Sequence, residues 1–301
     1  MNAQAASSGT EAARSGERGL EKALGQLGAA PIMARAGSEN FPVATHLLPG
    51  RTRRDLLALY GFARLVDQIG DEAPGDRLAL LDALEADLER VWGGTPEHPL
   101  LSGLVATVQA RRLPIDPFAR LIAANRRDQL QSRYETFDDL LGYCALSANP
   151  VGELVLGVFG AATPDRVARS NAICTALQLT EHWQDVAEDY VHGRVYVPVE
   201  DLERFGVAEV ELSGTAASAG LRRLMGFEVE RARALMTEGA PLIRMLHGRA
   251  ALAVALFVAG GRAALDALER AGYDVLGAQP RPGRGRRLIM LLTTLMARGV
   301  A

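Results

Sequence analysis

The chain has 301 residues, of which 48% are hydrophobic and 23% are charged, and its formal net charge is -3. These fractions exclude a disordered, collagen-like or disulfide-scaffold protein and allow one large domain or two small ones. The near-neutral charge provides no long-range field for nucleic acid, so we expect no nucleic-acid partner. Cys144 and Cys174 are the only cysteines and form no C-x-x-C pair, which fits a reducing compartment with both thiols buried.

The polar start of the chain contains no apolar signal-peptide segment. We therefore expect residues 1–37 to be a flexible leader and residues 38–301 to form a single helical domain. The most apolar stretch, Ala250–Ala259, is far shorter than the roughly 20 residues that span a bilayer. We expect a cytoplasmic protein, peripheral at most to the inner face of the membrane and able to touch a membrane transiently.

Apolar residues recur with helical spacing along almost the whole chain. Asp76 is a predicted N-cap and Gly93-Gly94 a predicted stop, and Pro117 occupies the first position of another helix. Only Val195–Val199 (VYVPV) resembles a strand, and it contains a proline. These patterns predict an all-α fold of about eight to ten helices. The predicted helical segments are 55–69, 76–92, the segment that opens at 116, 137–144, 151–159, 164–190, 217–238, 241–271 and 287–298.

Two acidic clusters interrupt otherwise apolar helices. The first contains Asp67 and Asp71, and the second contains Glu181, Asp185 and Asp189. Spacing of four residues places these carboxylates on one helical face, where like charges repel unless a cation lies between them. A solvated helix face is the ordinary interpretation of such a pattern. The apolar surroundings, and an arginine and a tyrosine beside each cluster, favour a binding site instead.

Oxygen ligands of this kind suit Mg²⁺, which retains water and is readily shared with substrate phosphates. Two facing carboxylate patches would hold several Mg²⁺ ions around a diphosphate, with arginine balancing the charge. The sequence has no P-loop, H-E-x-x-H or G-x-S-x-G motif, and no obvious metal-ligand spacing of histidines. His182 and His192 are interpreted as helix-surface residues. The pattern favours ionisation of an allylic or cyclopropylcarbinyl diphosphate, whose cation is sheltered in an apolar cavity.

Four ordered blocks resemble the squalene/phytoene synthase family of head-to-head prenyl synthases. They are ENFPVATHLLP (Glu39–Pro49), YGFARLVDQIGDE (Tyr60–Glu72), RYETFDDLLGYCALSANPVGELVL (Arg133–Leu156) and LQLTEHWQDVAEDYVHGRVYVP (Leu177–Pro198). The resemblance covers roughly Ser38 to Pro282. It implies an isoprenoid-synthase-type helical bundle with a central cavity, a prenyl diphosphate substrate and a cluster of Mg²⁺ ions.

Three details resemble the hydroxysqualene synthase branch of bacterial hopanoid pathways: E-N-F-P-V-A, S-A-N-P-V-G and W-Q-D. This branch implies a lyase that ionises presqualene diphosphate and captures the cation with water, releasing hydroxysqualene and diphosphate. No nicotinamide cofactor is expected, and separate enzymes would perform the condensation and the final reduction.

The resemblance also implies roles for individual residues. The catalytic aspartates would be Asp67, Asp71, Asp185 and Asp189, which together with Glu181 would bind the metal. The substrate-binding residues would be Phe41, Tyr60, Arg64, Leu146, Val151, Leu177, Gln178, Gln184, Arg194 and Tyr196. Of these, Phe41, Leu146, Val151 and Leu177 would line the hydrocarbon cavity, although core packing explains the four apolar side chains equally well.

Two departures from the family pattern concern the acidic clusters. Gln68 and Gly70 replace an aspartate and an alanine of the usual D-D-x-A-D, and Glu181 replaces an asparagine. Glycine in a helix costs roughly 1 kcal/mol relative to alanine, so Gly70 suggests a helix end beside the site.

Two alternatives stay open. One is a condensing synthase, a transferase that makes presqualene diphosphate, squalene or phytoene from prenyl diphosphates. The other is a relative without catalysis that serves as an assembly or scaffold protein. Retention of all four aspartates argues against the second alternative.

Overall fold

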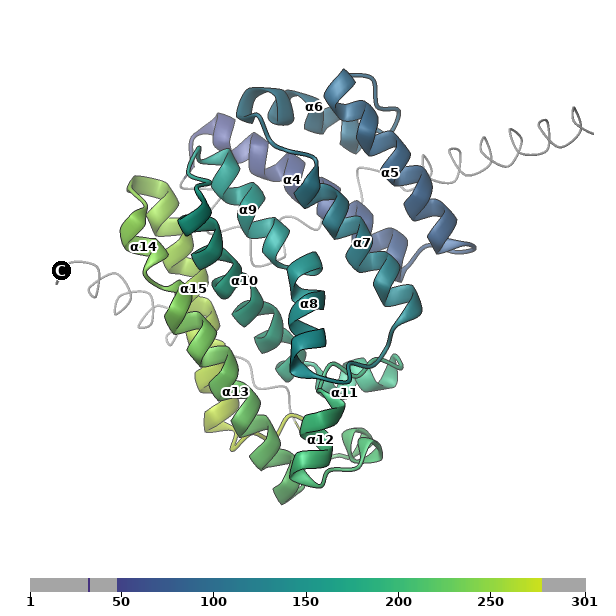
Figure 1. Cartoon of the computed structure of the whole chain (residues 1–301), viewed down its shortest axis with the longest axis vertical. Coiled ribbons are helices and arrows are strands. Elements are labelled where there is room, and N and C mark those ends of the chain that lie inside the picture. Colours follow the sequence, from purple (N-terminus) through teal and green to yellow (C-terminus); the bar gives the residue numbers. More distant parts are fainter. Residues whose placement is uncertain (1–31, 33–47, 278–301) are drawn as a thin grey trace, which may run out of the picture. The chain divides into compact units, whose positions relative to one another are not determined.

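The computed structural model describes Ile32 and residues 48–277 (Figure 1). Within these residues the fold is all-α, as predicted, and the predicted strand-like segment contributes only an isolated bridge between Arg133 and Val195. The expected leader, Phe41 and the helix at 287–298 lie outside the described residues. The helices gather into two compact units, 1–129 and 130–301, which are described one at a time. The single domain and the central cavity stay predictions.

Unit 1 contains four described helices. They are α4 (Gly50–Asp71), α5 (Arg77–Gly93), α6 (Pro99–Arg111) and α7 (Asp116–Leu130), the last of which ends at the boundary. The predicted ends of α5 are confirmed, because the Asp76 side chain accepts from the Ala79 N–H at 3.0 Å and Gly94 adopts φ 80°. Phe62 of α4 packs edge-on against Phe118 of α7, with ring centroids 5.1 Å apart.

A buried ion pair joins α4 to α6. Arg111 donates to Asp55 Oδ2 from Nε at 2.8 Å and from Nη2 at 2.6 Å, and the Thr107 hydroxyl donates to Asp55 Oδ1. Every oxygen of this buried carboxylate is therefore satisfied, as burial of a charge requires. The contact fixes the first half of α4, the helix that carries the first acidic cluster at its other end.

Unit 2 is built around α10. Its elements are α8 (Phe137–Ser147), α9 (Asn149–Val158), α10 (Pro164–Gln184), α11 (Val186–Val191), α12 (Val199–Phe205), the 3₁₀ helix η1 (Glu209–Ser213), α13 (Ala219–Gly239), α14 (Leu242–Met245) and α15 (Gly248–Arg270). The packing of α10 against α13 is the most extensive contact in the unit. Two glycines allow close approach to α10, because a Cβ on Gly152 would lie 2.3 Å from Ser170 Oγ and one on Gly239 would lie 2.7 Å from the Arg169 carbonyl oxygen.

Two predicted helices are each divided in the structure. The segment 164–190 is broken at Asp185, where φ −108° and ψ 14° leave the helical region, although i to i+4 backbone bonds continue on both sides. The segment 241–271 is broken at Leu246 and His247, and the next residue, Gly248, has φ 56°. The helices α6 and α12 and the short η1 were not anticipated.

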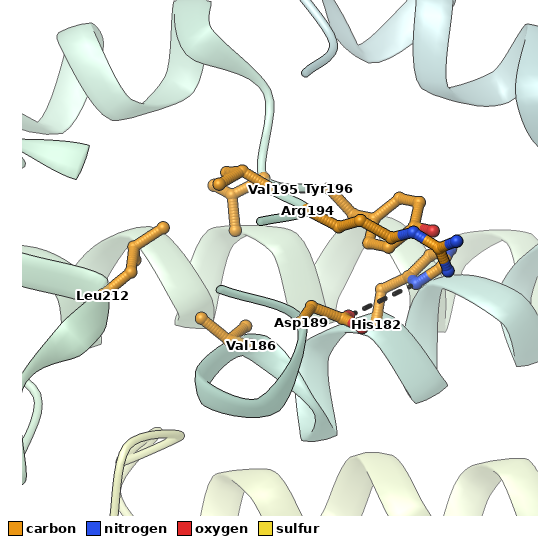
Figure 2. Close-up of a pocket in the computed structure, with 8 residues that line it drawn as sticks. His182, Val186, Asp189, Arg194, Val195, Tyr196 and Leu212 are labelled. Carbon is orange, nitrogen blue, oxygen red and sulfur yellow. Dashed lines mark ion pairs between the residues drawn. The ribbon is translucent and has the colours of Figure 1, made fainter. Parts of the chain in front are cut away.

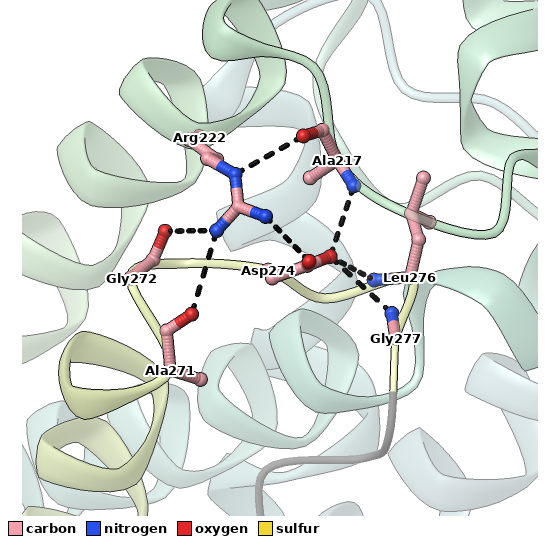
Figure 3. A network of polar contacts seen from close by, with 7 residues as sticks. All are labelled: Ala217, Arg222, Ala271, Gly272, Asp274, Leu276 and Gly277. Carbon is pink, nitrogen blue, oxygen red and sulfur yellow. Dashed lines mark hydrogen bonds and ion pairs between the residues drawn. The ribbon is translucent and has the colours of Figure 1, made fainter.

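The turn that follows α15 is tied back onto α13 by the carboxylate of Asp274 (Figure 3). Asp274 pairs with Arg222 and accepts from the Ala217 N–H at 2.9 Å. Arg222 also donates to the Gly272 carbonyl at 2.8 Å, so the turn after α15 is closed on both sides. These hydrogen bonds, with the Ala217 N–H the largest contributor, lower the pKa of Asp274.

Segments 137–158 and 248–270 are long and apolar enough to cross a membrane, by length and composition alone. The first is divided between α8 and α9. The second is α15, which is mostly buried against α10, α13 and α14 and so serves as a core helix of the unit.

We predict that Gly239→Ala destabilises unit 2, because the added Cβ meets backbone atoms of α10 that cannot move aside independently. The expected loss is about 1–3 kcal/mol, measured by denaturant unfolding. Gly260→Ala in α15 is the control, since a Cβ there meets nothing within 4 Å and should stabilise the helix by about 0.5–1 kcal/mol. Equal effects of the two changes would contradict the close packing of α10 and α13.

A second buried cluster links α12 to α13 away from the acidic motifs. Glu228 and Asp201 are 0% and 1% exposed and share one cation, Arg231, whose Nη1 lies 2.5 Å from Asp201 and 3.2 Å from Glu228. The Arg231 guanidinium also packs over the rings of Phe137 and Phe227. Burial, opposed in part by Arg231, raises the pKa of Glu228 to about 8.

We predict that Glu228 makes the protein less stable as pH rises from about 4.5 to about 8. The folded state binds the proton of Glu228 more tightly than the unfolded state does. Protonation of Glu228 therefore stabilises the fold fully below the unfolded pKa, and this stabilisation is lost as the pH rises through the folded pKa. Glu228→Gln should remove this part of the pH dependence and raise the unfolding temperature at pH 8 by about 2–4 °C. Thermal unfolding of both proteins at pH 5 and pH 8 tests this, and parallel pH profiles would contradict it.

Candidate functional site

The first acidic cluster occupies the last turn of α4. Asp67 is half-buried and Asp71 is exposed, and Arg64 Nη1 lies 3.7 Å from Asp67 Oδ2. Loss of water around Asp67, together with the charges of Asp71 and Asp128, raises its pKa to about 6, against the opposing effects of Arg64 and Asn125. The side chain of Asp67 is 47% exposed, so solvent screens part of this repulsion. The first cluster is thus a set of like charges only partly compensated by the protein.

The end of α4 is held in place by Arg77. Its guanidinium donates to the carbonyl oxygens of Ala73, Gly70 and Asp71 at 2.9 to 3.0 Å, groups that the helix end leaves without helical partners. The carboxylates are therefore carried on an ordered helical turn. The predicted helix end beside Gly70 is confirmed, since α4 ends one residue later.

The second acidic cluster lies at the bend between α10 and α11. Loss of water and the neighbouring charge of Asp185 raise the pKa of Glu181 to about 7, although the side chain remains open to solvent. The bend at Asp185 divides the predicted stripe, so that Glu181 lies in the last turn of α10, Asp185 lies at the bend itself and Asp189 lies on α11. The three carboxylates are close in sequence but are not carried by one straight helix.

Asp189 and Arg194 are brought together by the turn that ends α11. Gly193 has φ 79°, and the Arg194 N–H donates to the Asp189 carbonyl at 2.8 Å. The Arg133 guanidinium donates to the Gly193 carbonyl at 2.6 Å, and the Val195 N–H donates to Ser132. The segment that begins at Arg194 is therefore fixed against residues 132–134.

Four rings, those of His182, Tyr134, Tyr143 and Tyr196, pack together beside the second acidic cluster. His182 stacks on Tyr196 with centroids 3.6 Å apart and an interplanar angle of 16°. Tyr196 also lies against Tyr134 and Tyr143, each with a centroid distance of 5.7 Å. The interpretation of His182 as a helix-surface residue is wrong, because this tertiary stack buries it, whereas His192 is exposed as expected.

A small pocket beside the second cluster is lined by Asp189 of that cluster and by Arg194, the cation that can bind an anion (Figure 2). Figure 2 shows His182, Asp189, Arg194 and Tyr196 at the same end of this pocket. His182 Nδ1 lies 3.9 Å from Asp189 Oδ2, and its Nε2 is 3.2 Å from the amide nitrogen of Gln178. Burial lowers the pKa of His182 and so favours the neutral ring, against the opposing effect of Asp189. The apolar part of the lining consists of Val186, Val195, Val197 and Leu212.

The donor chemistry of both clusters fits Mg²⁺. Among the residues that the structure describes, no three His, Cys, Asp or Glu side chains form a group that could hold a metal ion by themselves. Each cluster instead offers carboxylate oxygens whose like charges are only partly compensated, and Mg²⁺ is commonly bound by one or two carboxylates with water and substrate phosphate completing its ligands. That the two clusters face each other stays a prediction.

The remaining predicted residues have different environments. Tyr60 is half-buried on α4, Gln184 is the last residue of α10, and Leu146 is half-buried on α8. Val151 is 37% exposed on α9, so its side chain is available to a ligand. Leu177 packs against the core of α10, α13, α14 and α15, where a Cβ on Gly261 would lie 2.7 Å from its Cδ2. This favours core packing for Leu177 over cavity lining.

Sequence reasoning did not find several residues of these clusters. Tyr134 and Tyr143 lie within the recognised third block but carried no assigned role. Asn125 and Asp128 of α7 act on Asp67 from more than fifty positions away. The S-A-N-P-V-G motif proves to hold α9 against α10, because Asn149 accepts from the Thr175 hydroxyl at 3.0 Å.

Comparison with known proteins identifies the family. The family model for squalene/phytoene synthase matches residues 34–287. A phytoene synthase of Arthrospira platensis is 33% identical over 277 residues, covering 87% of this chain and 90% of that protein. A hydroxysqualene synthase of Rhodopseudomonas palustris is 39% identical over 210 residues, covering 68% and 70% of the two chains.

Solved structures agree with this assignment. The squalene synthase HpnC from Alicyclobacillus acidocaldarius is 42% identical, with a TM-score of 0.77, and covers 85% of this chain and 95% of its own. A dehydrosqualene synthase in complex with a ligand is 25% identical, with a TM-score of 0.81, and covers 94% and 99% of the two chains. The predicted isoprenoid-synthase type of helical fold is confirmed. The chain belongs to the squalene/phytoene synthase family.

Proposed function

We propose that this protein ionises presqualene diphosphate and captures the resulting cation with water, so that it is a hydroxysqualene synthase. The carbon–oxygen bond to the diphosphate breaks and its electron pair leaves with the diphosphate. The cyclopropylcarbinyl cation rearranges, water forms the new carbon–oxygen bond, and the added water loses a proton. No reductant is needed for this balance.

The position of Arg194 beside the second acidic cluster is the observation that supports this chemistry most directly. Arg194 is a permanent cation on a turn fixed by backbone hydrogen bonds, beside Asp189 and the buried Tyr196. A guanidinium fixed before the reaction stabilises charge on a leaving diphosphate without reorganising during the step. Arg64, 3.7 Å from Asp67, provides a second cation in the first cluster.

The residues that would hold Mg²⁺ are Asp67, Asp71, Glu181, Asp185 and Asp189. When bound there, Mg²⁺ supplies Lewis-acid stabilisation of negative charge on the leaving diphosphate. The carboxylates themselves provide the charge that concentrates the cation, and their mutual repulsion makes the ion-free cluster unfavourable.

Apolar and aromatic side chains would shelter the hydrocarbon and restrict water. Leu146 and Val151 are accessible enough to contact a prenyl chain, whereas Tyr196 is buried and its ring is stacked on His182. Water has to reach the cation only once, at the carbon that gains the hydroxyl group.

The lyase is favoured over the condensing reaction by sequence detail. S-A-N-P-V-G and W-Q-D are the features that suggested this branch, and hydroxysqualene synthases occur among the relatives with 31–39% identity. Phytoene synthases match a longer part of the chain, at 33% identity over 277 residues, which supports condensation of two prenyl diphosphates as the second candidate.

The proposal includes location and partners. Both cysteines are free, and burial raises the pKa of Cys144 to about 12 and of Cys174 to about 11, as suits unreactive thiols in a reducing compartment. We place the enzyme in the cytoplasm, with transient contact at the inner membrane face for an apolar product. Separate enzymes would supply presqualene diphosphate and reduce the hydroxylated product.

Product analysis tests the proposed reaction. Purified protein with Mg²⁺ is given either presqualene diphosphate or farnesyl diphosphate, and products are identified by mass spectrometry. We expect hydroxysqualene from presqualene diphosphate, no reaction after removal of the metal by a chelator, and no turnover of farnesyl diphosphate alone. Turnover of farnesyl diphosphate alone would instead establish the condensing reaction.

We predict that Asp185→Ala lowers turnover of presqualene diphosphate by at least about 10²-fold, because a charge that binds the metal is lost. The fold should persist, since Asp185 lies at a helix bend and its removal relieves repulsion with Glu181. Asp165→Ala, at the exposed start of the same α10, is the matched control and should retain activity. Normal turnover by the Asp185 variant would refute the metal assignment.

A further inference from the structure

Gly70 and Asn125 form an unusually close contact between α4 and α7. A Cβ on Gly70 would lie 2.0 Å from Asn125 Oδ1 and 3.0 Å from its Cγ. Real Cβ atoms do not approach other atoms so closely, so any residue other than glycine would displace the Asn125 amide. Asn125 is 9% exposed, and its amide therefore has to satisfy its hydrogen bonds within the protein.

The orientation of this amide directs its nitrogen toward hydrogen-bond acceptors. Oδ1 faces the Cα of Gly70, while Nδ2 donates to the Leu121 carbonyl at 3.4 Å. The side chain also forms a hydrogen bond with the Asp67 carboxylate, which favours the charged form of Asp67. Asn125 is therefore a neutral donor placed between α7 and a predicted metal ligand.

Gln129 makes a neighbouring contact between α7 and α4, and this contact involves only backbone acceptors. Gln129, one turn further along α7, donates from Nε2 to the carbonyl oxygens of Gly70 at 3.0 Å and of Asn125 at 3.2 Å. These are backbone acceptors, so Gln129 secures the two helices at the same crossing. The side chain of Asn125, by contrast, bonds to the side chain of Asp67.

We propose that Asn125 is a positioning residue for Asp67 and that Gly70 is glycine because its missing side chain admits the Asn125 amide. This inference rests on the proposed function, in which Asp67 binds Mg²⁺. A carboxylate held by a second hydrogen bond presents its free oxygen in one direction, and such supporting bonds strengthen metal binding. The amide adds no charge to a cluster that already contains Asp67, Asp71 and Asp128.

The first experiment compares Gly70→Ala, Asn125→Ala and the double variant. The readout is calorimetric binding of inorganic pyrophosphate at increasing Mg²⁺ concentration, which requires no turnover. Each variant should raise the Mg²⁺ concentration for half-maximal binding by about 10-fold, in the range for lost supporting bonds. The double variant should be no worse than either single variant, because both changes remove the same hydrogen bond.

Gln129→Ala is the matched control, since it weakens the same helix crossing without touching the Asp67 side chain. It should lower the unfolding temperature without changing the Mg²⁺ requirement. The proposal is overturned if Asn125→Ala binds Mg²⁺ and pyrophosphate normally, or if Gln129→Ala shifts the requirement equally. Independent, multiplying effects of Gly70→Ala and Asn125→Ala would also overturn it.

Turnover of presqualene diphosphate adds a second discriminating measurement. Asn125→Ala should need more Mg²⁺ yet approach the unmodified rate when Mg²⁺ is saturating, because the ligand itself remains. Asp67→Ala separates the two proposals. If it leaves Mg²⁺-dependent pyrophosphate binding intact, the metal assignment fails, and the positioning role of Asn125 fails with it. If it abolishes binding while Asn125→Ala does not alter it, only the positioning role fails.

Discussion

The placing of carboxylates of like charge close together, with water partly removed from them, is the constraint on which the rest of the site depends. Loss of water, together with the neighbouring carboxylate, raises the pKa of Asp67 to about 6 and that of Glu181 to about 7. A fold can maintain such pairs only by fixing the backbone that carries them, because the side chains would otherwise separate. Arg77 fixes the backbone at the end of α4 by donating hydrogen bonds to the last carbonyl groups there. On α10 the constraint comes from packing against α13, which is the most extensive helix contact in its unit.

Glycine at helix crossings is the means by which these helices are brought close together. Gly152 and Gly239 allow α9 and α13 to approach α10, and Gly70 allows α7 to approach α4. The helices lose some intrinsic stability at each glycine and gain close packing in return. The three positions differ in what occupies the vacated space. At Gly239 it is backbone, at Gly152 it is a hydroxyl and a thiol, and at Gly70 it is an amide that reaches the acidic cluster.

Much of the fold and the composition of the site could be predicted from the sequence, because caps and periodicity are local. Asp76 and Gly94 end α5 as expected, and the Asp67–Asp71 pair lies on one helix as its spacing requires. The bend at Asp185 carries no such signal, since no glycine or proline is present and the helical spacing continues through it. The burial of His182 depends on Tyr196, fourteen positions away, and the role of Asn125 depends on a glycine in another helix. Contacts of this kind are tertiary and leave no pattern in one sequence.

The turn at Gly193 has a consequence for how the site can vary. The backbone hydrogen bond from Arg194 to Asp189 spans a fixed number of residues and passes through a positive φ that only glycine adopts easily. A predicted metal ligand and a predicted diphosphate cation are thereby joined as one rigid unit. Insertions or deletions between them would separate the two functions, whereas point substitutions at the exposed Val191 and His192 leave the distance unchanged. Apart from the glycine at 193, length rather than residue identity is what this loop has to preserve.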